Sequence, residues 1–499
     1  MCCDRGSEAV ELGNTMEFVS KLKQYFRKSE DARASSAYII CSVLQKTLSL
    51  LTLPLFSRML TKAEYGTNTV YTSTSAVIII FTTLNLPYGS FAPAMMKFED
   101  DRKGYLSAVN MICVLLTGAF FLLYYPFRGF WNGLVDLPTV LMLLMGFEML
   151  MSTSIQFWMG KARFECRYKA FVAVTLLTAV LGTACSLGAV LVSIDKGVAR
   201  VFANGVVICV VGAVILSASL VRGKSCFNKK YWKYALTFNI PLIPYYLSQI
   251  IFNQSDRLMI NKMTGKSDAA MYGVAYTLAF ILTFLLNAIN NSFVPWMYRK
   301  LKEKKLQDNK KVSVLISVVI AVLLLGVIAV APEFIRIMAG KKYMEAVWVV
   351  PPVALSLLLL FYSQLFINVE FYFEEKSKLV GASILAAVVN IVLNYFGIKQ
   401  FGFVAAGYTT LISYILFAVC NYVAMKKICM EQGIDGAIYN YRALILIFVS
   451  TAVLGFVIMV LYPYRIARIS VILAVLIVMV IMRKKLIGFA TKMMKNLAS

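Results

Sequence analysis

Two charged side chains lie in the middle of long apolar stretches of the sequence. Lys46 follows Val43-Leu44-Gln45, and Glu148 lies within Met145–Met149. A lysine at the centre of a membrane-spanning helix costs roughly 2.5–3.5 kcal/mol on insertion scales. A spanning helix tolerates that cost best where the lysine faces a water-filled cavity or a carboxylate. Two hypotheses stay open: Lys46 and Glu148 form a buried ion pair, or Lys46 binds an anionic group while Glu148 titrates.

Three arginines and one aspartate lie near the predicted ends of apolar runs. Arg33 precedes the first run, Arg58 ends it, and Asp256-Arg257 end the seventh. Each arginine could contact an anionic ligand, and Asp256 could couple transport to an ion. Each arginine could equally be an interfacial side chain whose head reaches water.

Amide and aromatic side chains form a third group of candidates. The amides recur at helical spacing, which places pairs of them on one helix face. In lipid they are costly unless paired, so they either bridge helices or bind ligand hydroxyls. The aromatic rings could stack on a ligand or belong to the interfacial aromatic belt. The candidates of this group are Gln45, Gln249, Asn253, Asn287, Asn290, Gln364, Asn368, Tyr245 and Tyr276.

The composition indicates what kind of scaffold positions these side chains. Of 499 residues 60% are hydrophobic and 15% are charged, with a mean hydropathy of +0.74. A soluble protein carries charge on roughly a quarter of its positions, so this chain is predicted to be an integral membrane protein. The net charge is +25, but no polar domain carries it, and a nucleic-acid partner is therefore not expected.

The residue types also exclude several kinds of catalysis. The chain has no histidine, which rules out Ser-His-Asp hydrolysis and histidine-based zinc sites. Its ten cysteines show no metal-ligand spacing. A membrane enzyme such as a glycan polymerase would be expected to carry a large outer loop, and no such loop is present. The sequence therefore predicts no metal, no cofactor and no enzymatic activity.

Fourteen segments are long and apolar enough to span a membrane, which takes about 20 residues each. Prolines at positions 87, 93, 241, 244, 351 and 352 are predicted to kink the helices that contain them. The predicted spans cover 36–56, 67–92, 104–125, 137–158, 170–193, 198–221, 233–256, 270–296, 312–331, 346–372, 378–398, 403–425, 442–462 and 466–482.

The cations predict the orientation of these spans. The termini and the loops on their side carry 35 of the 50 lysines and arginines, and the opposite side carries 13. Because basic residues gather on the cytoplasmic side, both termini are predicted to be cytoplasmic.

An internal repeat relates the first and seventh spans. Ser57-Arg58 is followed by Tyr65-Gly66, and Asp256-Arg257 by Tyr272-Gly273. A spacing of six spans predicts two six-helix lobes in parallel repeat, followed by two additional helices. The predicted divisions are a cytoplasmic N-terminal segment (1–35), a first lobe (36–221), a linker (222–232), a second lobe (233–425), a cytoplasmic loop (426–441), two further spans (442–482) and a cytoplasmic tail (483–499).

The motifs resemble those of a known family of transporters. Leu53–Gly66, Asp256–Ile260 with Met271–Tyr276, and Asn390–Ile398 continuing to Tyr414 are similar, in this order, to Wzx-like polysaccharide flippases. These proteins belong to the MOP (MATE-like) exporter superfamily. One departure is Lys399-Gln400-Phe401-Gly402, where the family usually has Pro-Arg-Phe-Gly.

The resemblance implies a fold, a substrate and a location. It implies a MATE-like, all-α membrane protein that moves an undecaprenyl-diphosphate-linked oligosaccharide from the inner to the outer leaflet by alternating access. It implies a bacterial cytoplasmic membrane, with membrane lipids and the polysaccharide polymerase and chain-length machinery as further partners. Lys46 and the arginines would then contact the diphosphate, while amides and aromatics would contact the glycan. A MATE-type drug exporter and a lipid II-type flippase are the alternatives.

Overall fold

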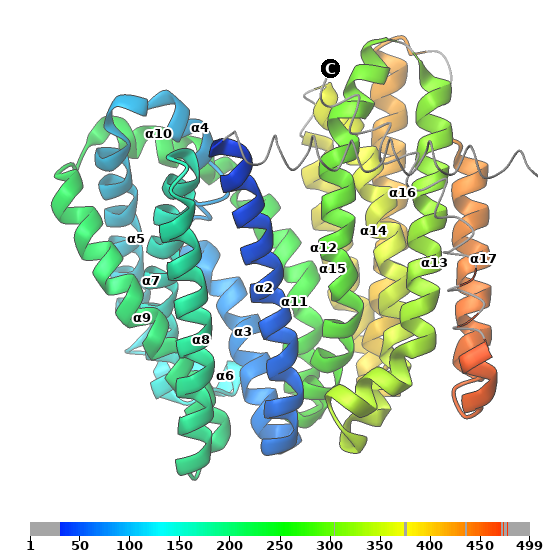
Figure 1. Ribbon diagram of the computed structural model, residues 1–499, viewed down its shortest axis with the longest axis horizontal. Helices are drawn as coiled ribbons and strands as arrows, with labels where there is room; N and C mark the ends of the chain where they lie inside the picture. Colours follow the sequence, from blue (N-terminus) through cyan, green and yellow to red (C-terminus); the bar gives the residue numbers. More distant parts are fainter. Residues whose placement is uncertain are drawn as a thin grey trace, which may run out of the picture. The chain divides into compact units, whose positions relative to one another are not determined.

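The computed structural model describes residues 30–303, 305–373, 377–434, 437–470, 473 and 477. Within these ranges, the side chains of 30–36, 39, 46, 280, 292 and 377–379 lie outside the description. The regular structure of the described residues is entirely helical, and the chain divides into two compact units (Figure 1).

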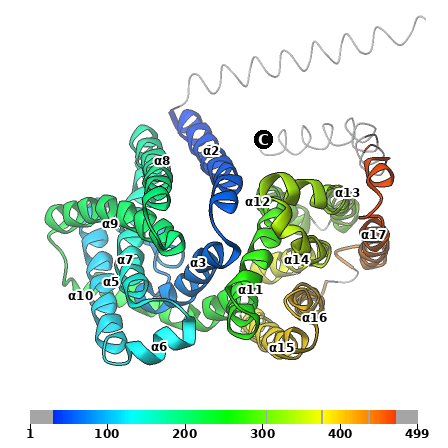
Figure 2. The ribbon, with the colours of Figure 1, turned by 90° about the horizontal axis from the view of Figure 1, so that it is seen from below.

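Unit 1 comprises residues up to Leu55, Ile79–Arg128 and Pro138–Leu242. Its helices comprise long ones that lie alongside one another and short ones at one end of the unit (Figures 1 and 2). They are α2 (Glu30–Met59, as far as Leu55), α4 (Phe91–Lys97), the 3-10 helix η1 (Glu99–Asp101), α5 (Arg102–Tyr124), α7 (Thr139–Phe164), α8 (Tyr168–Val192), α9 (Lys196–Gly223), α10 (Lys229–Asn239) and η2 (Ile240–Leu242).

Unit 2 comprises Phe56–Ile78, Gly129–Leu137 and the residues from Ile243 onward. Its long helices also lie alongside one another (Figure 2). They are α3 (Lys62–Thr83, as far as Ile78), α6 (Arg128–Val135), α11 (Ile243–Thr264), α12 (Lys266–Lys302), α13 (Leu306–Met338), η3 (Lys341–Val349), α14 (Val350–Tyr372), α15 (Ser377–Phe401), α16 (Ala405–Glu431) and α17 (Tyr441–Val460).

Short polar side chains begin several of these helices. Asp101, Asp195, Asn228 and Asn440 each accept a hydrogen bond from a backbone N–H in the first turn of the helix that follows. Such caps satisfy donors that have no partner inside the helix. Each cap therefore stabilises the start of its helix.

Among the described residues, twelve helices are long and apolar enough to cross a membrane. The chain is therefore a multi-pass membrane protein. Most of the fourteenth predicted span, 466–482, lies outside the described residues. The total of fourteen stays a prediction.

The second predicted span, a continuous helix over 67–92, is wrong. Helix α3 ends at Thr83, and α4 begins only at Phe91. Leu84 and Asn85 between them have φ angles of 49° and 51°, the left-handed region in which a right-handed helix cannot continue. Helix α3 is also not among the twelve apolar helices, because its first half is rich in threonine and serine.

The seventh span also differs from its prediction over 233–256. The segment that contains Pro241 divides it into α10 and α11, joined by η2, and α11 continues to Thr264. Asp256 and Arg257 therefore lie inside a helix and not at its end. Pro351 and Pro352 lie in the first turn of α14, where proline starts a helix without kinking it.

An aromatic core fixes one end of unit 1. Phe98, Tyr105 and Tyr231 pack together, with ring centroids 4.8–5.8 Å apart. The Tyr231 hydroxyl donates to Asp101 Oδ2 at 2.8 Å, and Asp101 Oδ1 accepts from the Gly104 amide at 2.9 Å. These contacts join α10 to the start of α5.

Glycines allow α3 and α12 to approach closely within unit 2. A Cβ on Gly66 would lie 2.1 Å from the Lys266 carbonyl oxygen. A Cβ on Gly273 would lie 3.0 Å from Thr69 Cγ2. The two Tyr-Gly pairs of the predicted repeat thus belong to facing helices, and the absence of a side chain at Gly66 is required by packing.

We expect Gly66→Ala to lower the apparent melting temperature of the purified protein. The added methyl group would overlap backbone atoms of α12, and overpacking of this kind costs about 1–3 kcal/mol. Gly188→Ala in α8 is the matched control, because nothing lies within 4 Å of a Cβ at Gly188. Equal melting temperatures for the two variants would contradict the close contact between α3 and α12.

Candidate functional site

Helix α11 carries two polar groups of unit 2 on neighbouring residues. Asp256 is buried and Arg257 is half-buried. Successive residues of a helix point about 100° apart, so the two side chains leave α11 in different directions. They enter two different sets of contacts.

Asp256 is the centre of a buried hydrogen-bond network. Its Oδ2 accepts hydrogen bonds from the Tyr272 hydroxyl at 2.5 Å and the Thr410 hydroxyl at 2.7 Å. Its Oδ1 accepts from Asn394 Nδ2 at 2.6 Å. The side chain is 1% exposed. A buried carboxylate needs such partners, and here they come from α12, α15 and α16.

A second layer of polar side chains extends this network. Asn390 Oδ1 accepts from Asn394 Nδ2 at 3.1 Å and from the Ser255 hydroxyl at 2.9 Å. The Thr409 hydroxyl donates to Asn394 Oδ1. All of these residues are buried. We refer to Asp256, Tyr272, Thr410, Asn390, Asn394, Ser255 and Thr409 together as the Asp256 cluster.

Arg257 contacts α12 directly and is linked to α3 through Gln254. Its Nη1 donates to Gln254 Oε1 at 2.5 Å, and the Ser73 hydroxyl donates to the same oxygen at 3.0 Å. Its guanidinium carbon lies 4.3 Å from the ring centroid of Tyr276. A cation over an aromatic face is stabilised electrostatically, and the contact is stronger when water is excluded. The guanidinium is therefore held in place inside unit 2.

The predicted amides mostly bridge helices. Gln249 Nε2 donates to the Ser383 hydroxyl at 2.9 Å, which joins α11 to α15. Asn253 Oδ1 accepts from the Tyr414 hydroxyl at 3.2 Å, which joins α11 to α16. The sequence allows two interpretations for these amides, bridging between helices and binding of a ligand. The structure contains the bridging hydrogen bonds.

Another such bridge joins α12 to α14. Asn368 Nδ2 donates to Asn290 Oδ1 at 2.8 Å. Asn287 is exposed, and Gln364 Oε1 is buried without a hydrogen-bond partner among the described residues. Tyr245 lies at the start of α11, with its ring centroid 5.7 Å from that of Tyr246.

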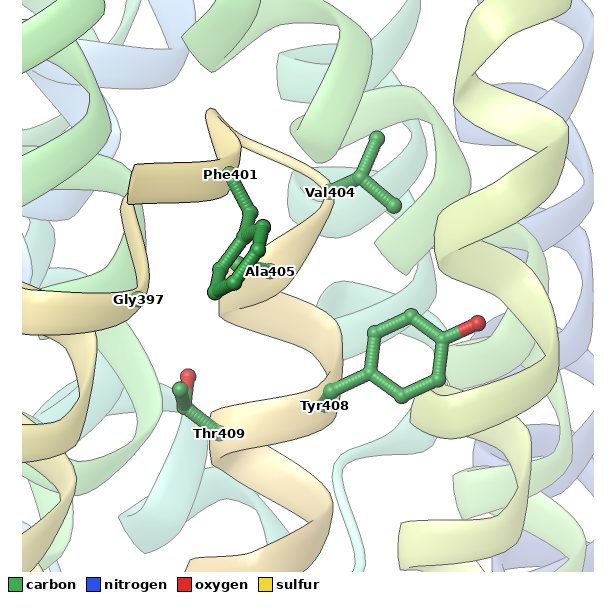
Figure 3. A pocket seen from close by; sticks show the side chains of 6 residues that line it. All are labelled: Gly397, Phe401, Val404, Ala405, Tyr408 and Thr409. Atoms are coloured by element: carbon green, nitrogen blue, oxygen red, sulfur yellow. The ribbon is translucent and has the colours of Figure 1, made fainter. Parts of the chain in front are cut away.

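A hollow of about 400 Å³ lies where α15 joins α16 (Figure 3). Phe401 and Tyr408 flank it, and Thr409 forms part of its wall. Its lining is almost entirely apolar. It therefore offers few hydrogen bonds to a glycan, although Thr409 connects it to the Asp256 cluster.

Residues 32–301, more than half of the chain, match the family described as polysaccharide biosynthesis protein. The chain belongs to this family. The resemblance to a polysaccharide family is confirmed by this match.

Two solved structures share the fold of this polysaccharide biosynthesis protein. A lipid II flippase, MurJ, in an inward closed conformation has a TM-score of 0.67 and 14% identity, covering 90% of this chain and 99% of its own. An inward-facing multidrug resistance MATE family transporter of the MOP superfamily has a TM-score of 0.62 and 12% identity, covering 79% and 96%. The all-α, MATE-like fold is thereby confirmed.

A curated relative matches a short stretch of this chain. Protein 1 of the Lsg locus of Haemophilus influenzae is 33% identical over 91 residues. The match spans 17% of this chain and 23% of the relative.

The candidates of unit 1 lie on α2 and α7. Lys46 and Arg33 lie on α2, but their side chains are outside the described residues. Gln45 is exposed on the same helix. Glu148 is half-buried on α7, and its Oε2 would lie 3.0 Å from a Cβ on Gly205 of α9. The pairing of Lys46 with Glu148 stays a prediction.

Arg58 has a structural contact at the end of α13. Its Nη2 donates to the Ile337 carbonyl at 3.1 Å, and the Ser57 hydroxyl donates to the Met338 carbonyl at 3.0 Å. The last carbonyls of a helix have no partner within it. The Ser57-Arg58 motif therefore caps α13.

The basic segment 299–311, which covers the end of α12 and the start of α13, contains ion pairs of its own. Glu303 lies 3.0 Å from Lys305 and 3.1 Å from Lys300, and Asp308 lies 3.6 Å from Lys300. The hydrogen bonds from Lys305 and Lys300 hold the pKa of the Glu303 carboxyl below its ordinary value. Glu303 and Asp308 therefore neutralise part of the positive charge of this segment.

The sequence alone missed most partners of Asp256 and Arg257. In the sequence, Tyr272 and Thr410 stand out only as parts of the family motifs, and no pattern singles out Ser73 or Gln254. The spacing of Asn390 and Asn394, one helical turn apart, was a usable signal. It indicated a shared face but not the carboxylate that this face contacts.

We expect Thr410→Val to lower the free energy of unfolding of the protein by about 1.5–3 kcal/mol, because it removes the hydrogen bond to Asp256 and a bond to a charged group contributes this much. The readout is the apparent melting temperature in detergent. Thr183→Val in α8 is the control, because among the described residues the Thr183 hydroxyl bonds only to the Ala179 carbonyl of its own helix. A Thr410→Val protein as stable as the control would show that the Asp256 cluster does not hold the helices of unit 2 together.

Proposed function

We propose that the protein is a flippase that moves an undecaprenyl-diphosphate-linked oligosaccharide from the inner to the outer leaflet by alternating access. The glycan would be a repeat unit of O-antigen, capsule or exopolysaccharide. Family membership and the transporter fold support this assignment. The observation that carries it is Arg257, a cation held inside a spanning helix next to a buried carboxylate.

The substrate class explains why charges inside the helices would be useful. A diphosphate crossing an apolar layer needs fixed cations along its path, because an unpaired charge in lipid is very costly. We assign Arg257 to this role, together with Lys46, Arg33 and Arg58. Amides and aromatic rings would bind the glycan, and the available amides include the exposed Asn287 and Gln364, whose Oε1 has no hydrogen-bond partner among the described residues.

Ion coupling is assigned to Asp256 and, in unit 1, to Glu148. Asp256 is surrounded by hydroxyl and amide groups that can rearrange around a proton or a monovalent cation. A carboxylate that exchanges its partners on binding such an ion provides the differential contacts that a two-state transporter requires.

The proposed location is a bacterial cytoplasmic membrane with both termini in the cytoplasm, because most cations lie on the side of the termini. The proposed partners are membrane lipids and the polymerase and chain-length machinery that would use the exported glycan. We propose no enzymatic activity and no nucleic-acid partner.

A MATE-type exporter of drugs or metabolites is the second candidate, and the buried Asp256 favours it. An exporter of cations would be expected to line its cavity with carboxylates. In unit 2 the Asp256 carboxylate is buried among its partners. The Arg257 guanidinium also has partners, but its side chain is only half-buried. This arrangement favours an anionic substrate, and a lipid II-type flippase would have the same requirement.

We expect Arg257→Ala to lower flipping of a lipid-diphosphate-linked oligosaccharide at least about tenfold in proteoliposomes, because removing one partner of a buried charged contact typically costs 2–5 kcal/mol. Lys46→Ala is expected to act in the same direction. Arg336→Ala, at an exposed position of α13, is the control and should flip normally. Normal flipping by Arg257→Ala would remove Arg257 from the substrate path.

We expect Asp256→Asn to abolish the response of flipping to an imposed proton or sodium gradient. The amide keeps the size of the carboxylate but cannot exchange a proton or neutralise a cation. Flipping would be measured in vesicles with and without each gradient, using Glu333→Gln as a comparison at another acidic side chain of unit 2. A gradient response that survives in Asp256→Asn would reject coupling through this residue.

A further inference from the structure

A second cavity of unit 2 lies between α14, α16 and α17 and has a volume of about 270 Å³. Helix α16 lines it with Ile415, Ala418, Val419 and Tyr422, and α17 lines it with residues that include Tyr441 and Ile445. The spacing of three or four residues means that each helix presents one continuous apolar face to the cavity. Figure 2 shows the three helices end-on, next to one another.

The open edge of this cavity lies on the outer surface of unit 2. Val419 is 50% exposed and Ile445 is 63% exposed. On a spanning helix, exposed aliphatic side chains face lipid. The cavity is thus accessible to the hydrocarbon chains of the bilayer.

Aromatic rings close one end of the cavity. The ring centroids of Tyr422 and Tyr441 lie 4.8 Å apart, and Phe366 lies 5.7 Å from Tyr422. The Tyr362 hydroxyl donates to the Leu444 carbonyl at 3.0 Å and joins α14 to α17 behind the rings. Tyrosines of this kind gather where a membrane helix reaches the headgroup region.

Two cations lie immediately beyond these rings. Lys426 is one turn after Tyr422 on the same face of α16, and Arg442 follows Tyr441 at the start of α17. Both are exposed, and neither forms an ion pair with a described residue. An apolar groove, an aromatic collar and a cationic end match, in this order, the acyl chain, the glycerol region and the headgroup of an anionic lipid.

We propose that this groove binds a phospholipid with an anionic headgroup, with an acyl chain between α16 and α17 and its phosphate near Lys426 and Arg442. In the orientation given under the proposed function, Lys426 and Arg442 lie on the cytoplasmic side, so this lipid would belong to the inner leaflet. The lipid would fill the gap between α17 and α16, so that α17 would stay attached to unit 2 through lipid as well as through α13 and α14.

The first test fills the groove. The full chain is purified in mild detergent from a phosphatidylglycerol-containing bacterial membrane, and bound lipid is counted by native mass spectrometry. Val419→Trp is expected to remove most of the bound phosphatidylglycerol. Val457→Trp on α17 is the matched control, because it has the same residue type, is 47% exposed, does not line the cavity and lies on the opposite face of its helix from the lining residues Tyr441 and Ile445.

The second test changes the charge. Lys426→Gln is expected to lower bound phosphatidylglycerol about fivefold, the factor that a single cation near a headgroup contributes, and to leave bound phosphatidylethanolamine much less affected. Lys427→Gln is the matched control, since Lys427 is exposed but points about 100° away from the groove face of α16.

Two outcomes would overturn the proposal. One is equal lipid retention by Val419→Trp and Val457→Trp together with no difference between Lys426→Gln and Lys427→Gln. The other is a bound molecule, sensitive to Val419→Trp, that is a polyprenyl diphosphate and not a phospholipid. Lipid counting requires no transport, so a failure of the flippase assignment in proteoliposomes would leave these measurements unchanged.

Discussion

The burial of Asp256 is the constraint on which the rest of unit 2 depends. A carboxylate with 1% exposure must find its partners inside the protein, and these come from Tyr272, Asn394 and Thr410 on three helices. The helices cannot separate without leaving a buried acidic group without partners. In a membrane, where apolar burial supplies little net drive between helices, such polar contacts carry much of the specificity of packing.

The motifs that resemble those of the family also hold helices together through local contacts. Ser57 and Arg58 supply hydrogen bonds to the last carbonyls of α13, and Gly66 removes the side chain that would hold α3 away from α12. Tyr272 gives its hydroxyl to Asp256. These residues therefore join the elements of unit 2, and Arg58 and Arg257 combine such contacts with a charge suited to an anionic substrate.

The sequence was sufficient for the class of fold but not for the contacts of the site. Apolar length predicts spanning helices well, because lipid leaves the backbone few alternatives. It failed at residues 84–90, where Asn85 and Pro87 end a helix within an apolar run, and at Arg257, where helix α11 outlasts its apolar stretch by about two turns. The four-residue spacing of Asn390 and Asn394 indicates one shared helix face. It could not tell that their face meets Asp256, because that contact depends on which helices become neighbours.

The adjacency of Asp256 and Arg257 links the two parts of the proposed mechanism through one helix. Asp256 contacts α12, α15 and α16, while Arg257 and Gln254 contact α3 and α12. A proton or cation that changes the hydrogen bonds of Asp256 would favour a different position of α11 against α15 and α16. Since Arg257 is the next residue of the same rigid helix, its guanidinium would have to move with it. Coupling between two sites requires an element that both sites bias, and α11 meets that requirement without a longer chain of contacts.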